Sequence, residues 1–258
     1  MVSVNIPTIK NDKYLPFAIE SVKNQLYQDV EIIINDEVPL SKARQEGIKK
    51  SQGKYIMFLD SDQILDPEAL ERCVSACEWQ GYDGVTLFEK SLITHNTFIE
   101  RVIAFDKEIF HSLEDDDPVN GTAVPRFYKK EFLDKVDYGA NPPLTLEDAI
   151  VHYQVAKMGA KIKFVRDAVI YHPETHTLKL LCKKFFRYGY FYIDALRKFP
   201  ELSKAHARPR RTYFTRQALS HPILWLGLWY VYLAKSISAI CGAIKFLIDE
   251  NISNRFRI

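Results

Sequence analysis

The sequence predicts an α/β fold with a mostly parallel central sheet, because short apolar runs alternate with amphipathic helical patterns up to about residue 170. The expected strands lie at residues 3–6, 30–35, 55–59 and 84–88, and the expected helices at 15–25, 40–51 and 67–79. This βαβ succession indicates a sheet covered by helices on both faces. Residues 90–119 show weak periodicity and carry no expected element; their acidic run, 114–117, is expected to be a solvated loop.

Composition narrows the possible functions. The chain has 258 residues, 47% of them apolar, which suffices for a full core. A net charge of +2 gives no general attraction to nucleic acid. The four cysteines lack metal-ligand spacing and are expected to be reduced and intracellular. A strand-like pattern from residue 1, with no cleavable signal before it, leads us to expect the N-terminal domain on the cytoplasmic side.

Two carboxylates follow the apolar run 54–59. Asp60 and Asp62 lie one residue apart, so an extended backbone places both side chains on the same side. Ligands of open α/β sheets bind outside the carboxyl ends of the strands, and divalent cations held by a few carboxylates often share their remaining positions with substrate phosphates. The pattern therefore predicts a cation site, and the alternative is a solvated acidic turn.

Five motifs occur in a definite order along the chain. They are Pro7–Asn11 after the first strand, Asn35–Asp36 after the second, residues 41–47 at the start of a helix, Asp60–Asp62, and Leu146–Asp148. Over roughly residues 2–190, this set resembles the inverting family 2 glycosyltransferases of the GT-A fold. It is similar to the membrane-associated members that transfer hexoses to polyprenyl phosphates or glycolipids.

The resemblance implies a nucleotide-sugar site. Pro7, Thr8, Ile9 and Asn11 would present backbone and hydroxyl groups to the nucleoside, Asp36 would accept hydrogen bonds from the base, Arg44 would bind the diphosphate, and Asp60 with Ser61 would face the ribose. Other readings stay open: Thr8 as a helix cap, and Arg44 as a surface residue paired with Glu46. The family often has Asn where this chain has Gln45.

The resemblance also implies a metal. Asp62 would ligate Mn²⁺ or Mg²⁺ directly, with Asp60 and His172 as further ligands. The cation would stabilise the charge that develops on the leaving nucleoside diphosphate. The alternative for His172 is a histidine hydrogen-bonded at the end of the apolar strand 168–171, and His176 is a weaker candidate.

A second acidic pair precedes the helical pattern 149–159. In the matching family position the Asp is the general base, so Asp148 would take the proton of an acceptor hydroxyl and Glu147 would orient the acceptor. Gly121 and Thr122 would line the acceptor or sugar pocket. Helix capping explains the acidic pair as an alternative, and a plain turn explains the Gly-Thr pair.

The chain changes character after residue 177. We divide it into a catalytic domain at 1–177, an amphipathic interface helix at 178–200, and a basic linker with C-terminal membrane-associated helices at 201–258. Lys179 and Arg187 of the interface helix could close over the diphosphate; single-stranded nucleic acid is the other ligand that its basic and aromatic residues would suit.

The apolar stretch 222–248 carries Lys235, whose insertion at mid-membrane would cost roughly 2.5 to 3.5 kcal/mol. We therefore expect a helix pair or a re-entrant anchor in the membrane rather than one clean span. A buried helical lid or an oligomer interface is the alternative, and the oligomeric state is open.

Together these features predict a metal-dependent hexosyltransferase that acts on a membrane lipid, either a glycolipid hydroxyl or a polyprenyl phosphate. GDP-mannose is the preferred donor and a UDP-hexose is possible. Two alternatives remain: a nucleotide-sugar pyrophosphorylase, although its glycine-rich loop is absent after the first strand, and a non-catalytic membrane scaffold with the same fold.

Overall fold

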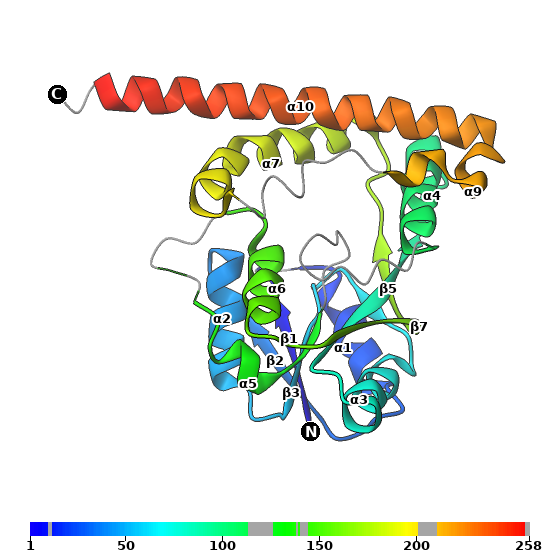
Figure 1. Cartoon of the computed structure of the whole chain (residues 1–258), viewed down its shortest axis with the longest axis vertical. Helices are drawn as coiled ribbons and strands as arrows, with labels where there is room; N and C mark the ends of the chain where they lie inside the picture. The colour runs from blue at the N-terminus through cyan, green and yellow to red at the C-terminus, as the bar shows by residue number, and fades with distance from the viewer. Residues whose placement is uncertain (10–11, 113–125, 138, 140–143, 201–210, 256–258) are drawn as a thin grey trace. The chain divides into compact units, whose positions relative to one another are not determined.

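The computed structural model describes residues 1–9, 12–112, 126–137, 139, 144–200 and 211–255 (Figure 1). The chain forms two compact units. The first comprises Met1–Leu92, Glu114–Pro142 and Glu147–Pro173, and the second comprises Ile93–Leu113, Pro143–Leu146 and Glu174–Ile258.

A seven-stranded sheet organises the first unit. Its strands are β1 (Val2–Pro7), β2 (Val30–Asn35), β3 (Tyr55–Phe58), β4 (Ile64–Leu65), β5 (Gly84–Leu92), β6 (Phe127–Lys129) and β7 (Ile162–Pro173), in the spatial order β2-β1-β3-β6-β5-β7-β4. β6 and β4 pair antiparallel with their neighbours and the other five strands run in one direction. The expected mostly parallel sheet is confirmed, and the two reversed strands are the part that the βαβ pattern did not predict.

Helices cover both faces of this sheet. They are α1 (Leu15–Lys23), α2 (Leu40–Lys50), α3 (Ala69–Gln80), α5 (Lys130–Leu133) and α6 (Glu147–Lys157). Tyr55 and Met57 of β3 join the larger core cluster with α1 and α3, whereas Ile56 and Phe58 join a second cluster with α6. Successive side chains of a strand point to opposite faces, so a fully apolar strand needs an apolar layer on each side.

The strand register aligns the carboxyl ends of three strands. Pro7 of β1 pairs with Asn35 of β2, and Asn5 of β1 pairs with Phe58 of β3. Thr8, Asp36 and Asp60 each follow one of these strands and so lie at the same edge of the sheet.

The second unit is helical. Its elements are α4 (Phe98–Ser112), α7 (Leu178–Lys198), the 3₁₀ turn η1 (Arg211–Phe214), α9 (Arg216–Leu219) and α10 (Pro222–Arg255). α7 packs along α10 in direct backbone contact: a Cβ atom on Gly189 would collide with the carbonyl group of Ala239, and one on Gly242 with that of Phe186. Such close crossings need small residues at the contact.

α10 is one uninterrupted helix, so the expectation of a helix pair or re-entrant turn at 222–248 is wrong. That expectation rested on the charge of Lys235, which would be costly in the middle of a single membrane span. In the structure, Lys235 is only 19% exposed, its Nζ lies 3.7 Å from Asp106 Oδ2 of α4, and its ammonium lies over the ring of Phe185. A lysine with partners on neighbouring helices does not require α10 to break.

Helix α4 falls where the sequence showed no element, although its start carries a clear signal. Thr97 and Glu100 form a capping box: the Thr97 N–H donates to Glu100 Oε2 at 3.0 Å, and the Glu100 N–H donates to Thr97 Oγ1 at 3.2 Å. Burial raises the pKa of Glu100, but hydrogen bonds from the Thr97, Thr94 and His95 backbones lower it by more, from 4.5 to about 2. Glu100 is therefore a buried anion that orders the entry into α4.

We predict that Glu100→Gln lowers the free energy of unfolding by about 0.5 to 2 kcal/mol at neutral pH, as loss of a cap does. Because the folded-state pKa is depressed, this stabilisation is present above pH 4.5 and lost as the pH falls towards about 2. Thermal unfolding across that window should show a shallower acid dependence in the variant than in the wild type. Glu108→Gln, an exposed position of the same helix, is the control, and equal slopes for Glu100→Gln and the wild type would contradict the prediction.

Candidate active site

The carboxyl ends of β1 and β2 form an exposed polar edge of the sheet. The Thr8 N–H donates to the Asn35 carbonyl at 2.8 Å, which fixes the start of the loop after β1 beside the end of β2. Ile9 and Asp36 are exposed there, and Pro7 is buried at the end of β1. Asn11, also expected at this edge, lies outside the described residues. The arrangement leaves Thr8 and Asp36 accessible to a ligand at the sheet edge.

Arg44 is a buried residue of α2 that reaches into the site. Its side chain is 3% exposed, with Nη2 3.0 Å from Asp60 Oδ1 and Nη1 3.7 Å from Glu147 Oε1. Asn5 donates to the Arg44 carbonyl at 3.0 Å, and Gly47, one turn later, leaves room for the Asn5 side chain. The alternative pairing of Arg44 with Glu46 is wrong, since Glu46 pairs with Lys49 on the surface.

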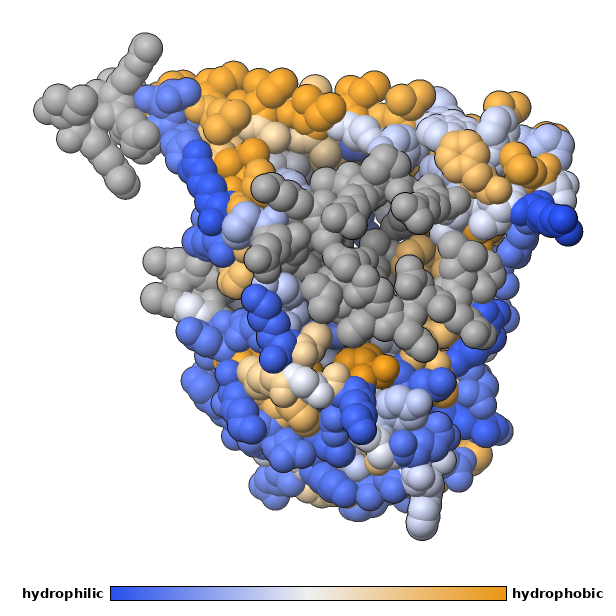
Figure 2. All heavy atoms as spheres, in the orientation of Figure 1, coloured by the Kyte–Doolittle hydropathy of each residue, from blue (hydrophilic) through white to orange (hydrophobic). Residues whose placement is uncertain are grey.

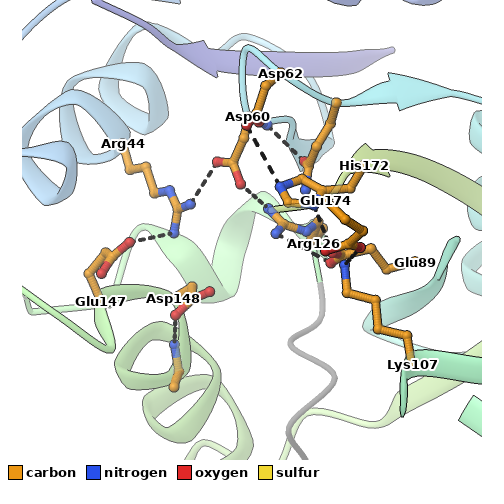
Figure 3. A network of polar contacts seen from close by, with 12 residues as sticks. Arg44, Asp60, Asp62, Glu89, Lys107, Arg126, Glu147, Asp148, His172 and Glu174 are labelled. Atoms are coloured by element: carbon orange, nitrogen blue, oxygen red, sulfur yellow. Dashed lines mark hydrogen bonds and ion pairs between the residues drawn. The ribbon is translucent and has the colours of Figure 1, made fainter. Parts of the chain in front are cut away.

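A second arginine, Arg126, approaches Asp60 from another side (Figure 3). Its Nη1 donates to Asp60 Oδ2 at 3.0 Å, and its Nη2 lies 3.8 Å from Glu89 Oε2. The backbone explains the placement: the Phe58 N–H donates to the Arg126 carbonyl, and the Arg126 N–H donates to the Val85 carbonyl, so Arg126 precedes β6 between β3 and β5. Both oxygens of Asp60 therefore accept from a guanidinium group.

These contacts set the charge of Asp60. Burial raises its pKa, but the charges of Arg126, Arg44 and His172 lower it by more, so the pKa of this carboxyl lies well below its usual range. Asp60 is 28% exposed and remains an anion although only part of it reaches solvent.

Asp62 and His172 come together through a short antiparallel pairing. Ile64 of β4 pairs with Tyr171 of β7, which brings the segment before β4 next to the end of β7. His172 Nε2 lies 3.7 Å from Asp62 Oδ2, and its Nδ1 lies 3.6 Å from Glu89 Oε1. Ser61, between the two aspartates, donates to the carboxylate of Asp12. The expected neighbourhood of Asp62 and His172 is thus present, with Glu89 as an added member.

The acidic pair at the start of α6 completes the cluster. Burial raises the pKa of Glu147, the charge of Asp148 adds to the rise, and Arg44 opposes it. Asp148 Oδ1 accepts from the Ala149 N–H at 2.8 Å, as a residue at a helix N-terminus does. Glu147 is thus set up to hold or take a proton more readily than an exposed carboxylate.

The contacts alternate between carboxylates and side chains that carry nitrogen. They run Glu147, Arg44, Asp60, Arg126, Glu89, His172, Asp62, with each neighbour 3.0 to 3.8 Å from the next. Guanidinium groups and an imidazole held among carboxylates suit a multiply charged anion together with a cation. Among the residues that the structure describes, no group of three or more His, Cys, Asp or Glu side chains is arranged to hold a metal ion by itself.

Sequence reasoning missed Arg126 and Glu89, and four of the residues that it assigned to the site are not tested by the structure. Gly121 and Thr122 lie outside the described residues. Lys179 and Arg187 are exposed residues of α7 in the second unit, so their contact with a diphosphate remains a prediction. No local pattern marks Arg126, because its position depends on the antiparallel insertion of β6.

Comparison with known proteins finds similarity to glycosyltransferases over part of the chain. Residues 35–135 match the family described as Glycosyl transferase family 2. A relative from Haemophilus influenzae, described as an uncharacterized glycosyltransferase, is 29% identical over 100 residues that cover 28% of this chain and 40% of the relative. One from Rickettsia bellii, with the same description, is 38% identical over 97 residues, covering 27% of this chain and 14% of the relative. The matches span less than half the length of these relatives.

Solved structures show the same fold. The mannosyltransferase PcManGT from Pyrobaculum calidifontis, in complex with GDP-Man and Mn²⁺, aligns with a TM-score of 0.57 at 13% identity over 96% of this chain and 87% of its own. S. aureus TarS aligns with a TM-score of 0.52 at 12% identity over 94% of this chain and 54% of its own. The expected GT-A type fold is confirmed.

We predict that Arg126→Gln raises the pKa of Asp60 towards its ordinary value and lowers the free energy of unfolding by roughly 1 to 3 kcal/mol, because it leaves one carboxylate oxygen unpaired. Carboxylate NMR titration and chemical denaturation measure the two effects. Arg72→Gln, which breaks an exposed pair with Glu68 on α3, is the matched control and should cost no more than about 1 kcal/mol. An unchanged Asp60 titration would refute the pairing.

Proposed function

We propose that the chain is a family 2 glycosyltransferase, namely an inverting, metal-dependent hexosyltransferase that uses a nucleoside-diphosphate sugar and a lipid acceptor; the match of residues 35–135 to that family supports this. The observation that carries this proposal is the pair of guanidinium groups held on Asp60 next to Asp62 and His172 at the edge where β1, β2 and β3 end. GDP-mannose is our first candidate donor and a UDP-hexose the second; the solved complex of PcManGT with GDP-Man supports that order.

The nucleotide would lie along the sheet edge. Thr8 and the exposed Asp36 offer a hydroxyl group and a carboxylate to the nucleoside, and Asp36 accepts hydrogen bonds from N–H groups of a base. Arg44 and Arg126 hold planar forks at the adjacent position, where a diphosphate would exchange carboxylate partners for phosphate oxygens. Donor binding thus replaces existing ion pairs with others of the same kind.

Asp62 and His172 fit a divalent cation that takes its remaining ligands from water and the diphosphate. Two ligands that are each about 2.1 Å from one ion lie roughly 3 to 4 Å apart, and Asp62 Oδ2 is 3.7 Å from His172 Nε2. A carboxylate and an imidazole are both acceptable to Mn²⁺. When bound, such a cation stabilises the charge on the leaving diphosphate. A direct role for Asp60 as a ligand remains a prediction, since both its oxygens bind arginines.

Asp148 is our candidate general base. Its carboxylate would take the proton of the acceptor hydroxyl as that oxygen bonds to the anomeric carbon and the bond from carbon to the diphosphate breaks, so that one displacement inverts the configuration. Glu147, whose pKa is raised by burial and by Asp148, is positioned by Arg44 to orient the acceptor or share the proton. A lipid phosphate acceptor is already anionic and needs no base.

The lipid acceptor is inferred from α10. By length and composition, this helix could cross a membrane, and little of its apolar surface is buried in the described residues. Its exposed apolar residues recur three or four positions apart and form what we call the α10 stripe: Ile223, Leu226, Tyr230, Leu233, Ile237, Ile240, Ile244 and Leu247. Figure 2 shows apolar residues along the length of this helix. A continuous stripe of this kind suits a membrane surface.

The packing of α7 favours an orientation in the plane of the membrane. Lys183, Lys184 and Arg187 are exposed on α7, which is bound to α10 by close backbone contacts and by the bidentate pair of Arg197 with Glu250. If α10 crossed the bilayer, α7 would carry these charges to hydrocarbon depth at about 2.5 to 3.5 kcal/mol each. Lying in the interface, α10 places the stripe in the acyl region while the basic residues meet anionic headgroups.

We predict that Asp148→Asn lowers transfer to a hydroxyl acceptor by 10² to 10⁴-fold and leaves donor binding intact, because only proton removal is lost. Transfer is measured with a glycolipid and with a polyprenyl phosphate as acceptors, and donor binding by thermal shift with GDP, GDP-mannose, UDP and UDP-hexoses, with and without Mn²⁺. Retained turnover with the phosphate acceptor identifies that acceptor class.

The control for this variant is Asp167→Asn, an exposed carboxylate of β7, which should behave as the wild type. A chain that shows no metal-dependent shift with any nucleotide, and no transfer, would contradict the proposed function.

We predict that Ile237→Glu with Ile244→Glu in the α10 stripe reduces flotation with anionic vesicles by at least tenfold, since two charges enter the apolar contact. The matched control is Leu26→Glu with Trp79→Glu, two exposed apolar residues of the first unit. Equal flotation of the two double variants would argue against membrane contact through the stripe.

A further inference from the structure

The second unit contains a partly open pocket of about 520 Å³, which we call the cavity; its volume is within the range of small-molecule binding sites. Its walls come from α7, η1, α10, one residue of α4 and the segment before α6. The lining side chains are largely aromatic or aliphatic; they include Phe185, Tyr188, Tyr192, Tyr213, Tyr232 and Ala243. A partly open space of this size with mostly apolar walls has the dimensions and lining of a ligand pocket.

The helices that frame the cavity are held at a fixed distance from one another. α7 and α10 touch through their backbones at Gly189 and Gly242, while Tyr190 donates to Asp249 at 3.1 Å further along. On the other side, Trp225 Nε1 donates to the Tyr213 carbonyl at 3.0 Å, and the rings of Tyr213 and Trp229 are 5.5 Å apart, edge to face. Because α7 and α10 are already in backbone contact, they cannot move closer to fill the space.

The chemistry of the walls selects the ligand. Apart from the hydroxyl groups of its tyrosines and of Ser236 and Thr145, the polar side chains of the lining are Lys235 and Asp106, whose charged atoms lie 3.7 Å apart. A sugar or a nucleotide would lose many hydrogen bonds to water in such a place. A hydrocarbon chain would lose none, and aromatic and aliphatic walls give it dispersion contacts on all sides.

The cavity is connected with the α10 stripe. Ile240 lines the cavity and is also 59% exposed as a member of the stripe. If the α10 stripe contacts a membrane, the hydrocarbon chain of a lipid can pass beside Ile240 from the acyl region into the cavity without crossing water.

Two residues that line the cavity directly precede the candidate catalytic acids in the sequence. Thr145 and Leu146 line the cavity, and the next two residues are Glu147 and Asp148. Leu146 has a φ of 61°, a left-handed conformation that favours glycine, yet a leucine occupies it. A strained backbone at a residue whose side chain lines the cavity is consistent with a functional demand on that side chain.

We propose that this cavity binds the hydrocarbon chain of the lipid acceptor. The inference rests on the proposed hexosyltransferase function and deepens it by assigning the residues that recognise the acceptor's chain. Recognition of the hydrocarbon chain rather than the head group explains how one site could serve a lipid phosphate or a lipid alcohol.

The test uses the full chain in amphipol, without detergent, and measures binding of geranyl phosphate, geraniol and inorganic phosphate by tryptophan fluorescence. Trp229 reports because its ring contacts Tyr213 and Tyr232 of the cavity wall. We expect geranyl phosphate and geraniol to bind and inorganic phosphate not to. Tighter binding of geranyl phosphate assigns an anionic head group, and equal binding assigns a neutral one.

The decisive variant is Ser236→Phe, which fills the cavity and should weaken binding of both prenyl probes at least tenfold. Cys241→Phe is the matched control: it adds the same ring to a residue of nearly the same size that is exposed on the same helix and outside the cavity, and it should bind as the wild type. If Ser236→Phe does not fold, as judged by its melting transition, Ala243→Leu takes its place. Labelling of the wild type with a diazirine-bearing geranyl phosphate should also mark peptides of α7 and α10 that contain Tyr188, Tyr192 or Tyr232.

Wild-type binding in both cavity-filling variants, or labels confined to other segments, would overturn the proposal. The assay contains no donor, so its outcome is separate from that of the proposed function. Binding of the prenyl probes without any sugar transfer would contradict the proposed hexosyltransferase function but would leave the cavity assignment intact. If Ser236→Phe transferred sugar to a lipid as well as the wild type does, the cavity assignment would be contradicted and the hexosyltransferase function would be supported.

Discussion

The site depends on the carboxylate of Asp60, which is held between two guanidinium groups. Arg44 comes from α2 and Arg126 from the residue before β6, so this contact joins segments 16 and 66 positions from Asp60 in the chain. A charge that is largely removed from water costs free energy unless it has a partner of opposite charge. The two arginines provide such partners for the carboxylate of Asp60, and Asp60 does the same for them. The same contacts fix the positions of the two guanidinium groups that we propose as diphosphate ligands, which would reduce the ordering cost of donor binding.

The surroundings shift the pKa values of two carboxyl groups of the site in opposite directions. The pKa of Asp60 is lowered by two arginines and a histidine, whereas that of Glu147 is raised by burial and by its neighbour Asp148. Active sites commonly assign different roles to acids of one type in this way. In the proposed reaction, Asp60 would stay an anion that positions the two arginines, and the acidic pair at the start of α6 would carry out proton transfer.

Much of this site could be predicted from the sequence, because the ends of neighbouring parallel strands must meet at one edge. That rule located Asp60 and Asp62, whereas Thr8, Asp36 and Glu147 were predicted from the resemblance to family 2 glycosyltransferases. Arg126 and Glu89 could not be found in the same way: their positions depend on β6 being inserted antiparallel between β3 and β5, a long-range pairing without a local signal. The start of α4 did carry a signal, Thr97 followed by Glu100, that weak periodicity in its surroundings concealed.

α10 shows why composition alone gave an incomplete answer for the second unit. Its apolar residues serve two separate purposes: one set forms the exposed stripe, and another set faces α7 and the cavity. A hydropathy profile along the sequence adds the two sets together, so the segment looks like a membrane span. The charge of Lys235 then suggested that this span is interrupted. Only the packing of α7 and α4 separates these contributions, since it assigns Lys235 to Asp106 and leaves the stripe uncovered. A helix with charged partners along one side and apolar residues along the other is suited to a boundary between water and lipid, which is where the proposed donor and the proposed lipid acceptor would meet.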